Sequence, residues 1–230
     1  MAADDQPESD PSPGSNRQPG RGPNPESSRE SSGARVEAAA SVRRLIHGLV
    51  GHDGPEIDLA EVARQAGELA DRLERGPRRV RPEGNMVRYP QPVADGAELT
   101  CWQDCMIAGE AHPQGTGLEA YRDGDEAVAQ VELGPAHEGP PGRAHGGMVA
   151  SLFDEVMGFA LWMDSVPAYT AWLRVDYRRP MPLAEPIELR ASISGRERRK
   201  LFLTSTARSN GEILAEAEAL FVIPKDLGPH

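Results

Sequence analysis

The sequence predicts an α+β domain in which one long helix accompanies an antiparallel sheet. A single apolar helical run, residues 146–164, interrupts a series of segments in which polar and apolar residues alternate. Two turn signals, Asp123-Gly124 and Asn210-Gly211, join neighbouring segments as hairpins. The resulting order, β-β-α-β-β-β-β, with one helix among hairpins, places the domain in the α+β class.

The N-terminal third of the chain is predicted to hold a disordered tail (residues 1–35) and two amphipathic helices (residues 36–76). Residues 1–34 contain no Leu, Ile, Val, Phe, Trp or Tyr, and half of them are Pro, Gly or Ser. Such a segment cannot bury enough apolar surface to offset the entropy lost on ordering. Apolar residues then recur at helical spacing up to Gly51, and again up to Gly76.

Residues 77–114 are rich in Pro, Gly and charge, and are predicted to form a linker or an extended arm. Residues 115–224 hold the predicted sheet and helix, and residues 225–230 a C-terminal tail. A first hairpin and a Gly/Pro-rich loop precede the helix. The expected strands cover residues 117–122, 126–133, 169–177, 187–194, 199–208 and 213–221.

Composition excludes several classes of function. The net charge of −11 argues against nucleic acid as a partner. No run of 18 apolar residues occurs, so no membrane span is expected, and the polar N-terminus does not read as a signal peptide. A cytoplasmic protein is therefore expected. The two cysteines, Cys101 and Cys105, stand four residues apart with no second pair, so no metal site is expected.

The candidate chemistry lies at the start of the long helix, at His145-Gly146-Gly147 and Asp154. Paired glycines let a ligand approach bare backbone N–H groups, where the helix dipole favours negative charge. A carboxylate inside an apolar helix is costly to bury without a partner or a function. The alternative is that Asp154 and Glu155 form a solvated polar stripe and that His145 only caps the helix or packs against it.

These residues, with residues 139–144 and 169–180, resemble the hotdog-fold acyl-CoA thioesterases of the phenylacetate-pathway and thioesterase-superfamily type. The resemblance continues through Gly195-Arg196 to the alanine-rich last strand, and covers about residues 115–224. It implies a sheet wrapped around one central helix, in a homodimer or a dimer of dimers. It does not extend to residues 1–100.

The resemblance also implies roles for individual residues. Asp154 would be the general base or the nucleophile, and the Gly146 N–H would polarise the thioester carbonyl. The Thr170 hydroxyl would position water or substrate, and His145 would orient the glycine loop. Some relatives carry an Asn or Gln shortly before the His-Gly-Gly triplet, whereas residues 139–143 contain neither.

Acyl-CoA is the implied substrate, with CoA as part of it and no separate cofactor. Its phosphates need cations, and two basic clusters of this acidic chain lie at residues 178–179 and 196–200. We therefore expect Gly147, Arg178, Arg196 and Lys200 to hold the substrate. The alternative for the second cluster is a solvated hairpin tip.

Two other functions stay open for such a domain. One is a non-catalytic acyl-CoA-binding or regulatory protein, which would not need Asp154. The other is an enoyl-CoA hydratase, whose site usually pairs an Asp with a His a few residues later on the helix. Residues 155–164 contain no His, which disfavours the hydratase.

Overall fold

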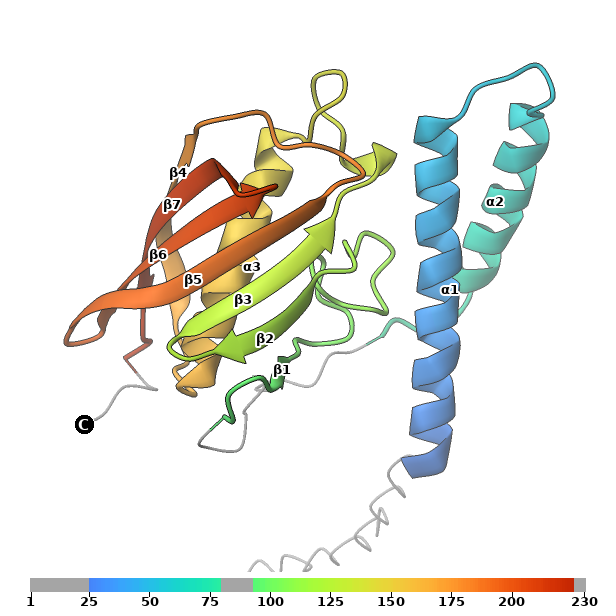
Figure 1. Ribbon diagram of the computed structural model, residues 1–230. Coiled ribbons are helices and arrows are strands. Elements are labelled where there is room, and N and C mark those ends of the chain that lie inside the picture. Colours follow the sequence, from blue (N-terminus) through green and yellow to red (C-terminus); the bar gives the residue numbers. More distant parts are fainter. Residues whose placement is uncertain (1–24, 80–92, 226–230) are drawn as a thin grey trace, which may run out of the picture.

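The computed structural model describes residues 25–79 and 93–225 (Figure 1). A seven-stranded antiparallel sheet curves around one long helix, and two further helices stand beside this unit. The elements are α1 (Pro25–Gly51), α2 (Leu59–Glu74), β1 (Glu98–Leu99), β2 (Glu119–Asp123), β3 (Glu126–Glu132), a short 3-10 helix η1 (Pro135–His137), α3 (Gly146–Met163), β4 (Tyr169–Tyr177), β5 (Pro186–Glu197), β6 (Lys200–Ser209) and β7 (Glu212–Val222).

The predicted α+β class is confirmed, and the strand order within the sheet is β1-β2-β3-β5-β6-β7-β4. The strand that follows α3 in sequence therefore pairs with the last strand of the chain and lies at the edge of the sheet. The six strands expected from the alternating pattern all form. The additional strand, β1, has two residues, which is too short to produce a period-two signal.

Helix α3 forms the centre of the core because its apolar residues cover most of its circumference. Leu152, Phe153, Val156 and Phe159, the predicted core face, are all buried. Burial of each such side chain contributes about 1.5–3 kcal/mol relative to exposure. The helix begins where the His145 Nδ1 accepts a hydrogen bond from the Gly147 N–H (3.0 Å), which caps one of the free donors of the first turn.

Strand β4 contains an irregularity that changes which side chains face α3. Its register with β7 shifts between Thr170 and Trp172, so Ala171 is an extra residue. One extra residue reverses the alternation, and Thr170 therefore lies on the same side as Leu173 and Val175, which pack on the core. Strict alternation along residues 169–177 would place Thr170 on the opposite side from these apolar residues, so the bulge changes the side that Thr170 faces.

Helix α1 begins earlier than the sequence predicts. Residues 25–35, assigned to the disordered tail, form its first part, while residues 1–24 lie outside the described residues. The composition of a segment limits what it can bury, but Glu, Arg and Ala still favour a helix that continues from an anchored one. Both predicted amphipathic helices form, and α2 is capped by the Asp58 side chain, which accepts from the Glu61 N–H (3.0 Å).

Within the part of the chain that the structure describes, three hydrogen bonds anchor helix α1 to the sheet unit. The Arg43 guanidinium donates to the carbonyl oxygens of Glu110 (3.1 Å) and His112 (2.9 Å). The His47 Nδ1 accepts from the N–H of Ala136 in η1 (3.2 Å). No helix in the described part of the chain is long and apolar enough to cross a membrane.

The segment predicted as a linker is partly incorporated into the core. Residues 80–92 lie outside the described residues, but from Val93 onward the chain packs on the domain. Leu99, Ile107 and Ala111 are buried, and Leu99 pairs with β2. Of the two predicted forms of this segment, a linker or an extended arm, a linker does not describe residues 93–114, because a few irregularly spaced apolar residues anchor this polar stretch to the domain.

Candidate active site

The predicted catalytic carboxylate meets the predicted hydroxyl at the start of β4. The Thr170 Oγ1 donates to the Asp154 Oδ1 at 2.7 Å, and both residues are exposed. The hydroxyl holds one carboxylate oxygen, which leaves the other able to accept a hydrogen bond from a water. The bulge at Ala171 produces this contact, since it turns Thr170 toward α3.

The predicted polarising N–H lies at the other end of β4. The Gly146 N–H has no hydrogen-bond acceptor among the described residues, whereas the Gly147 N–H donates to the His145 Nδ1. The Tyr177 hydroxyl donates to the Gly146 carbonyl oxygen (2.8 Å) and fixes the first turn of α3 against the end of β4. Sequence reasoning missed Tyr177, although alternation along the strand places its side chain on the same face as Leu173 and Val175.

A hollow of about 360 Å³ lies against Gly146. Tyr177 lines it, together with three arginines, Arg143, Arg178 and Arg179. Arg178 and Arg179 form ion pairs with Glu216 and Glu212 (both 2.8 Å), so part of their charge is already compensated. A free N–H at a helix start beside guanidinium groups suits a ligand that carries negative charge.

The two halves of the predicted site do not meet within one chain. Gly146 and Asp154 are separated by eight residues, which corresponds to about 12 Å along a helix axis. A thioester carbonyl bound at the Gly146 N–H is therefore out of reach of the Asp154 carboxylate of the same chain.

The basic residues are separated in the same way. Arg178 follows the end of β4, whereas Arg196 and Lys200 lie at the β5–β6 turn, where Lys200 pairs with Val222 and Val222 pairs with Tyr169 at the start of β4. The two basic groups are therefore roughly 30 Å apart along the strand. The chain brings Gly146, Gly147 and Arg178 to one end, and Asp154, Thr170, Arg196 and Lys200 toward the other.

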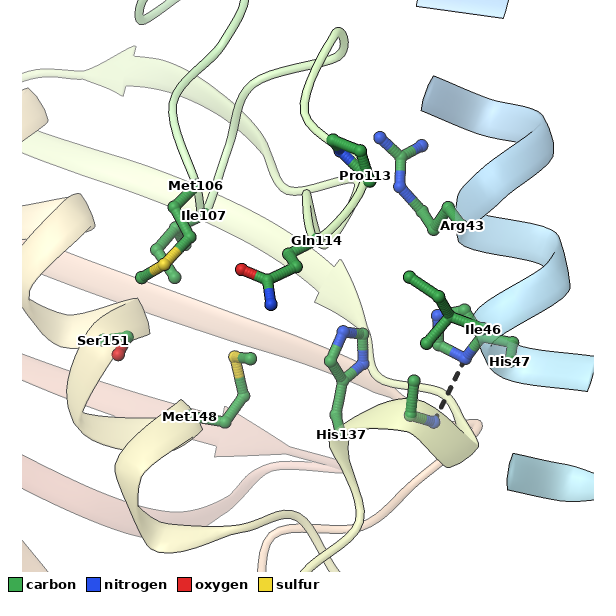
Figure 2. Close-up of a pocket in the computed structure, with 11 residues that line it drawn as sticks. Arg43, Ile46, His47, Met106, Ile107, Pro113, Gln114, His137, Met148 and Ser151 are labelled. Atoms are coloured by element: carbon green, nitrogen blue, oxygen red, sulfur yellow. Dashed lines mark hydrogen bonds between the residues drawn. The ribbon is translucent and has the colours of Figure 1, made fainter. Parts of the chain in front are cut away.

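A pocket of about 290 Å³ separates α1 from α3 (Figure 2). Met148 and Ser151 reach it from α3, and Ile46 and His47 from α1. The loop after β1 and the short helix η1 supply the remaining walls, which include Met106, Ile107, Gln114 and His137. Burial lowers the pKa of His137 to about 4, with a further contribution from the neighbouring His47, so His137 is neutral at pH 7. The pocket is therefore largely uncharged apart from Arg43.

The partly buried carboxylate of α3 is Glu155, whereas Asp154 faces solvent. Asp154 is exposed, so the burial cost expected for it does not arise. Glu155 is partly buried beneath the loop that follows β1, and its burial raises the pKa of this carboxyl to about 8. Both Glu155 oxygens lie 3.3 Å from the Cys105 Sγ. Sequence reasoning placed both acids on one solvated stripe as its alternative, and the helix turns them into different environments.

Comparisons with known proteins point to one superfamily. Residues 141–216 match the family model described as the thioesterase superfamily. The chain is 30% identical over 115 residues to acyl-coenzyme A thioesterase THEM4 of Rattus norvegicus, covering 47% of this chain and 50% of that protein. It is 36% identical over 97 residues to the THEM4 of Xenopus laevis, covering 41% and 44%. The chain thus spans about half the length of the curated relatives it matches.

The structural comparison extends over more of the chain. A crystal structure of a thioesterase superfamily protein matches with a TM-score of 0.68 and 24% identity, covering 82% of this chain and 90% of the other. At this identity the likeness establishes the fold, which is the hotdog arrangement of a sheet wrapped around a central helix. The sheet and α3 of this chain therefore have the hotdog fold, and the match to the thioesterase superfamily model lies within this unit.

Proposed function

We propose that the protein is an acyl-CoA thioesterase that hydrolyses the thioester to a free acid and CoA. The observation that carries this proposal is the Thr170–Asp154 hydrogen bond of 2.7 Å, which orients a carboxylate toward solvent on the helix that also presents the free Gly146 N–H. The similarity to proteins named acyl-coenzyme A thioesterase supports the choice of substrate class.

The reaction needs an attacking oxygen and a stabilised oxyanion. In one route Asp154 takes a proton from a water, whose oxygen attacks the thioester carbon. In the other the carboxylate attacks directly, and water then hydrolyses the mixed anhydride. In both routes the C–S bond breaks and the CoA thiolate leaves and is protonated. A backbone N–H aimed at the carbonyl oxygen stabilises the charge that develops there, and one such donor contributes about 3–4 kcal/mol.

We further propose that the complete site forms between two subunits. β4 is an edge strand whose side chains include the exposed aromatic residues Tyr169, Trp172 and Tyr177. An unpaired, apolar edge favours pairing with another chain. α3 runs antiparallel to β4, since its Gly146 contacts Tyr177 and its Asp154 contacts Thr170. If two β4 strands pair antiparallel around a two-fold axis, Asp154 of one subunit faces Gly146 of the partner subunit.

The same arrangement explains the division of the basic residues. Antiparallel pairing of β4 places Arg196 and Lys200 of one chain near the end where Arg178 of the partner subunit lies. The predicted phosphate-binding residues would then flank one composite site, in which two basic segments from different chains hold the nucleotide part of CoA.

The pocket between α1 and α3 is the proposed place for the acyl group. Met148 and Ser151 line it, and Ser151 stands one turn before Asp154 on α3. Met106, Ile107 and Ile46 supply apolar, adaptable walls for an alkyl or aryl group. In this proposal α1 closes the acyl site, which gives the N-terminal helix a role in substrate selection.

Filling this pocket should change substrate preference. We expect Ile46→Trp to lower kcat/KM for medium-chain acyl-CoA by roughly tenfold relative to acetyl-CoA, because the indole occupies the space of a few methylene groups. Val50→Trp is the matched control, since Val50 lies on the same helix and is 57% exposed. Equal losses for both substrates, or equal effects of both variants, would place the acyl group elsewhere.

A hydrolysis assay tests the function itself. Acetyl-, medium-chain, long-chain and phenylacetyl-CoA are incubated with the protein, and released CoA is measured with a thiol-reactive dye. A reaction without substrate subtracts the signal of the Cys101 and Cys105 thiols. We expect catalytic release from at least one class. A folded protein that binds CoA and releases none from any class would instead support the non-catalytic acyl-CoA-binding function.

A further inference from the structure

Two cysteines in the loop between β1 and β2 lie close to a glutamate that is about 50 residues further along the chain. Cys101 and Cys105 come from this loop, and Glu155 comes from α3. One ligand atom of each residue lies within 4.8 Å of the others. Both cysteines are free thiols, and all three residues are partly buried.

The loop is built to hold the two sulfurs on the same side. The Cys105 N–H donates to the Trp102 carbonyl oxygen (2.8 Å), and the Gly109 N–H donates to the Cys105 carbonyl oxygen (3.0 Å). Gly109 is buried, and a Cβ at this position would collide with the Cys105 backbone. A glycine therefore allows the loop to close tightly around Cys105.

Among the described residues, no cationic side chain forms an ion pair with the acidic groups of this cluster. The residue before Glu155 on α3 is a second acid, Asp154, which adds to the negative charge near the cluster. Both thiols donate hydrogen bonds to nearby groups. The Cys101 thiol donates to the Trp102 carbonyl oxygen (3.2 Å), and the Cys105 thiol donates to the Glu155 carboxylate (3.3 Å).

We propose that Cys101, Cys105 and Glu155 form a binding site for a borderline-soft divalent cation, with Zn²⁺ as the best match. The ligands would be the two Sγ atoms and one carboxylate oxygen, with a water at the fourth position. A tetrahedral zinc site brings such atoms to about 3.5–3.8 Å from one another, so atoms that lie within 4.8 Å here would approach by up to about 1 Å. Thiolates favour zinc over Mg²⁺ and Ca²⁺, which prefer oxygen ligands.

Binding would displace both thiol protons to solvent and supply the positive charge that Glu155 lacks. The cation would also clamp the loop after β1 to α3, next to Asp154. The sequence predicts no metal site because the spacing of the two cysteines lacks a second pair. The fold supplies the third ligand from a helix 50 residues further along the chain.

The test uses the full-length chain, freed of metal and kept in a phosphine reductant. Zn²⁺ is titrated by calorimetry, and Co²⁺ is added to a second sample to detect the near-ultraviolet charge-transfer band of a cobalt–thiolate bond. We expect one equivalent of either cation to bind and the cobalt band to appear. At a hundredfold excess over Kd, zinc should raise Tm by roughly 5–10 °C.

Variants assign the ligands. Cys105→Ser and Glu155→Gln should each weaken zinc binding by roughly 100-fold, because each removes one of three ligands. Glu197→Gln, which removes an exposed carboxylate at the β5–β6 turn, is the matched control and should bind as the unchanged chain does. No variant enters the cobalt measurement, so its result does not depend on whether a variant folds.

Three results would overturn the proposal. One is the absence of a cobalt–thiolate band when thiol titration shows both cysteines free. Another is zinc binding that Cys105→Ser and Glu155→Gln leave unchanged. The third is a Cys101–Cys105 disulfide that persists in the reductant. The readouts are binding and melting rather than hydrolysis, so the metal site and the thioesterase function fail or succeed independently.

Discussion

Asp154→Asn should lower the turnover of acyl-CoA by roughly 100-fold or more, the usual effect of removing an acid–base group. The substitution keeps the size of the side chain and still accepts the hydrogen bond of the Thr170 hydroxyl (2.7 Å), but it removes the negative charge. Affinity for an unreactive CoA analogue should be retained, since the proposed phosphate contacts involve other residues. Turnover, affinity and Tm are measured on one preparation.

The control for this variant is Asp164→Asn, which changes an exposed carboxylate at the C-terminal end of the same helix. Unchanged turnover in Asp154→Asn would remove both proposed mechanisms. A joint loss of Tm and affinity would show that Asp154 acts as a structural partner. Because Asp154 is exposed, we expect the Tm of the Asp154→Asn variant to stay within about 2 °C of that of the unchanged chain.

The strands and the long helix could be predicted from the sequence because the hydrophobic period and the turn residues agree along most of the domain. β4 has the predicted bounds, and α3 begins at Gly146 as expected. Both have strong local signals: alternation over nine residues in one, and an apolar run after two glycines in the other. The prediction was less successful for residues 93–114. Their packing depends on contacts with distant parts of the chain, and their few apolar residues follow no regular period.

The candidate site residues could be named from the sequence, but their positions relative to one another could not. Ala171 reverses the parity of β4, and a bulge of this kind has no signature in an otherwise regular strand. The same limit applies to α3, where helical periodicity places Asp154 and Glu155 side by side and cannot say which is covered. The loop that covers Glu155 reaches it from residue 105, and that contact depends on the whole fold.

Gly146 and Asp154 lie far apart along α3, and this separation leads to the second prediction. Two variants that are inactive alone should regain activity when their chains form a mixed dimer. Gly146→Pro removes the polarising N–H with little disturbance. Gly146 is the first residue of the helix, where proline is well tolerated, and His145 before it already has extended backbone (φ −65°, ψ 134°). We expect this variant to lose roughly 100-fold or more in turnover.

In a dimer paired along β4, each site takes Asp154 from one subunit and Gly146 from the partner subunit. A mixed dimer of Asp154→Asn and Gly146→Pro chains then contains one doubly altered site and one intact site. Coexpression with two affinity tags isolates this mixed dimer, and its turnover should return to about half that of the unchanged dimer. Each variant alone stays inactive, so the recovered signal cannot come from either parent. A mixed dimer no more active than its parents, or a fully active monomer in sedimentation, would place the reacting groups within one chain and contradict the shared site.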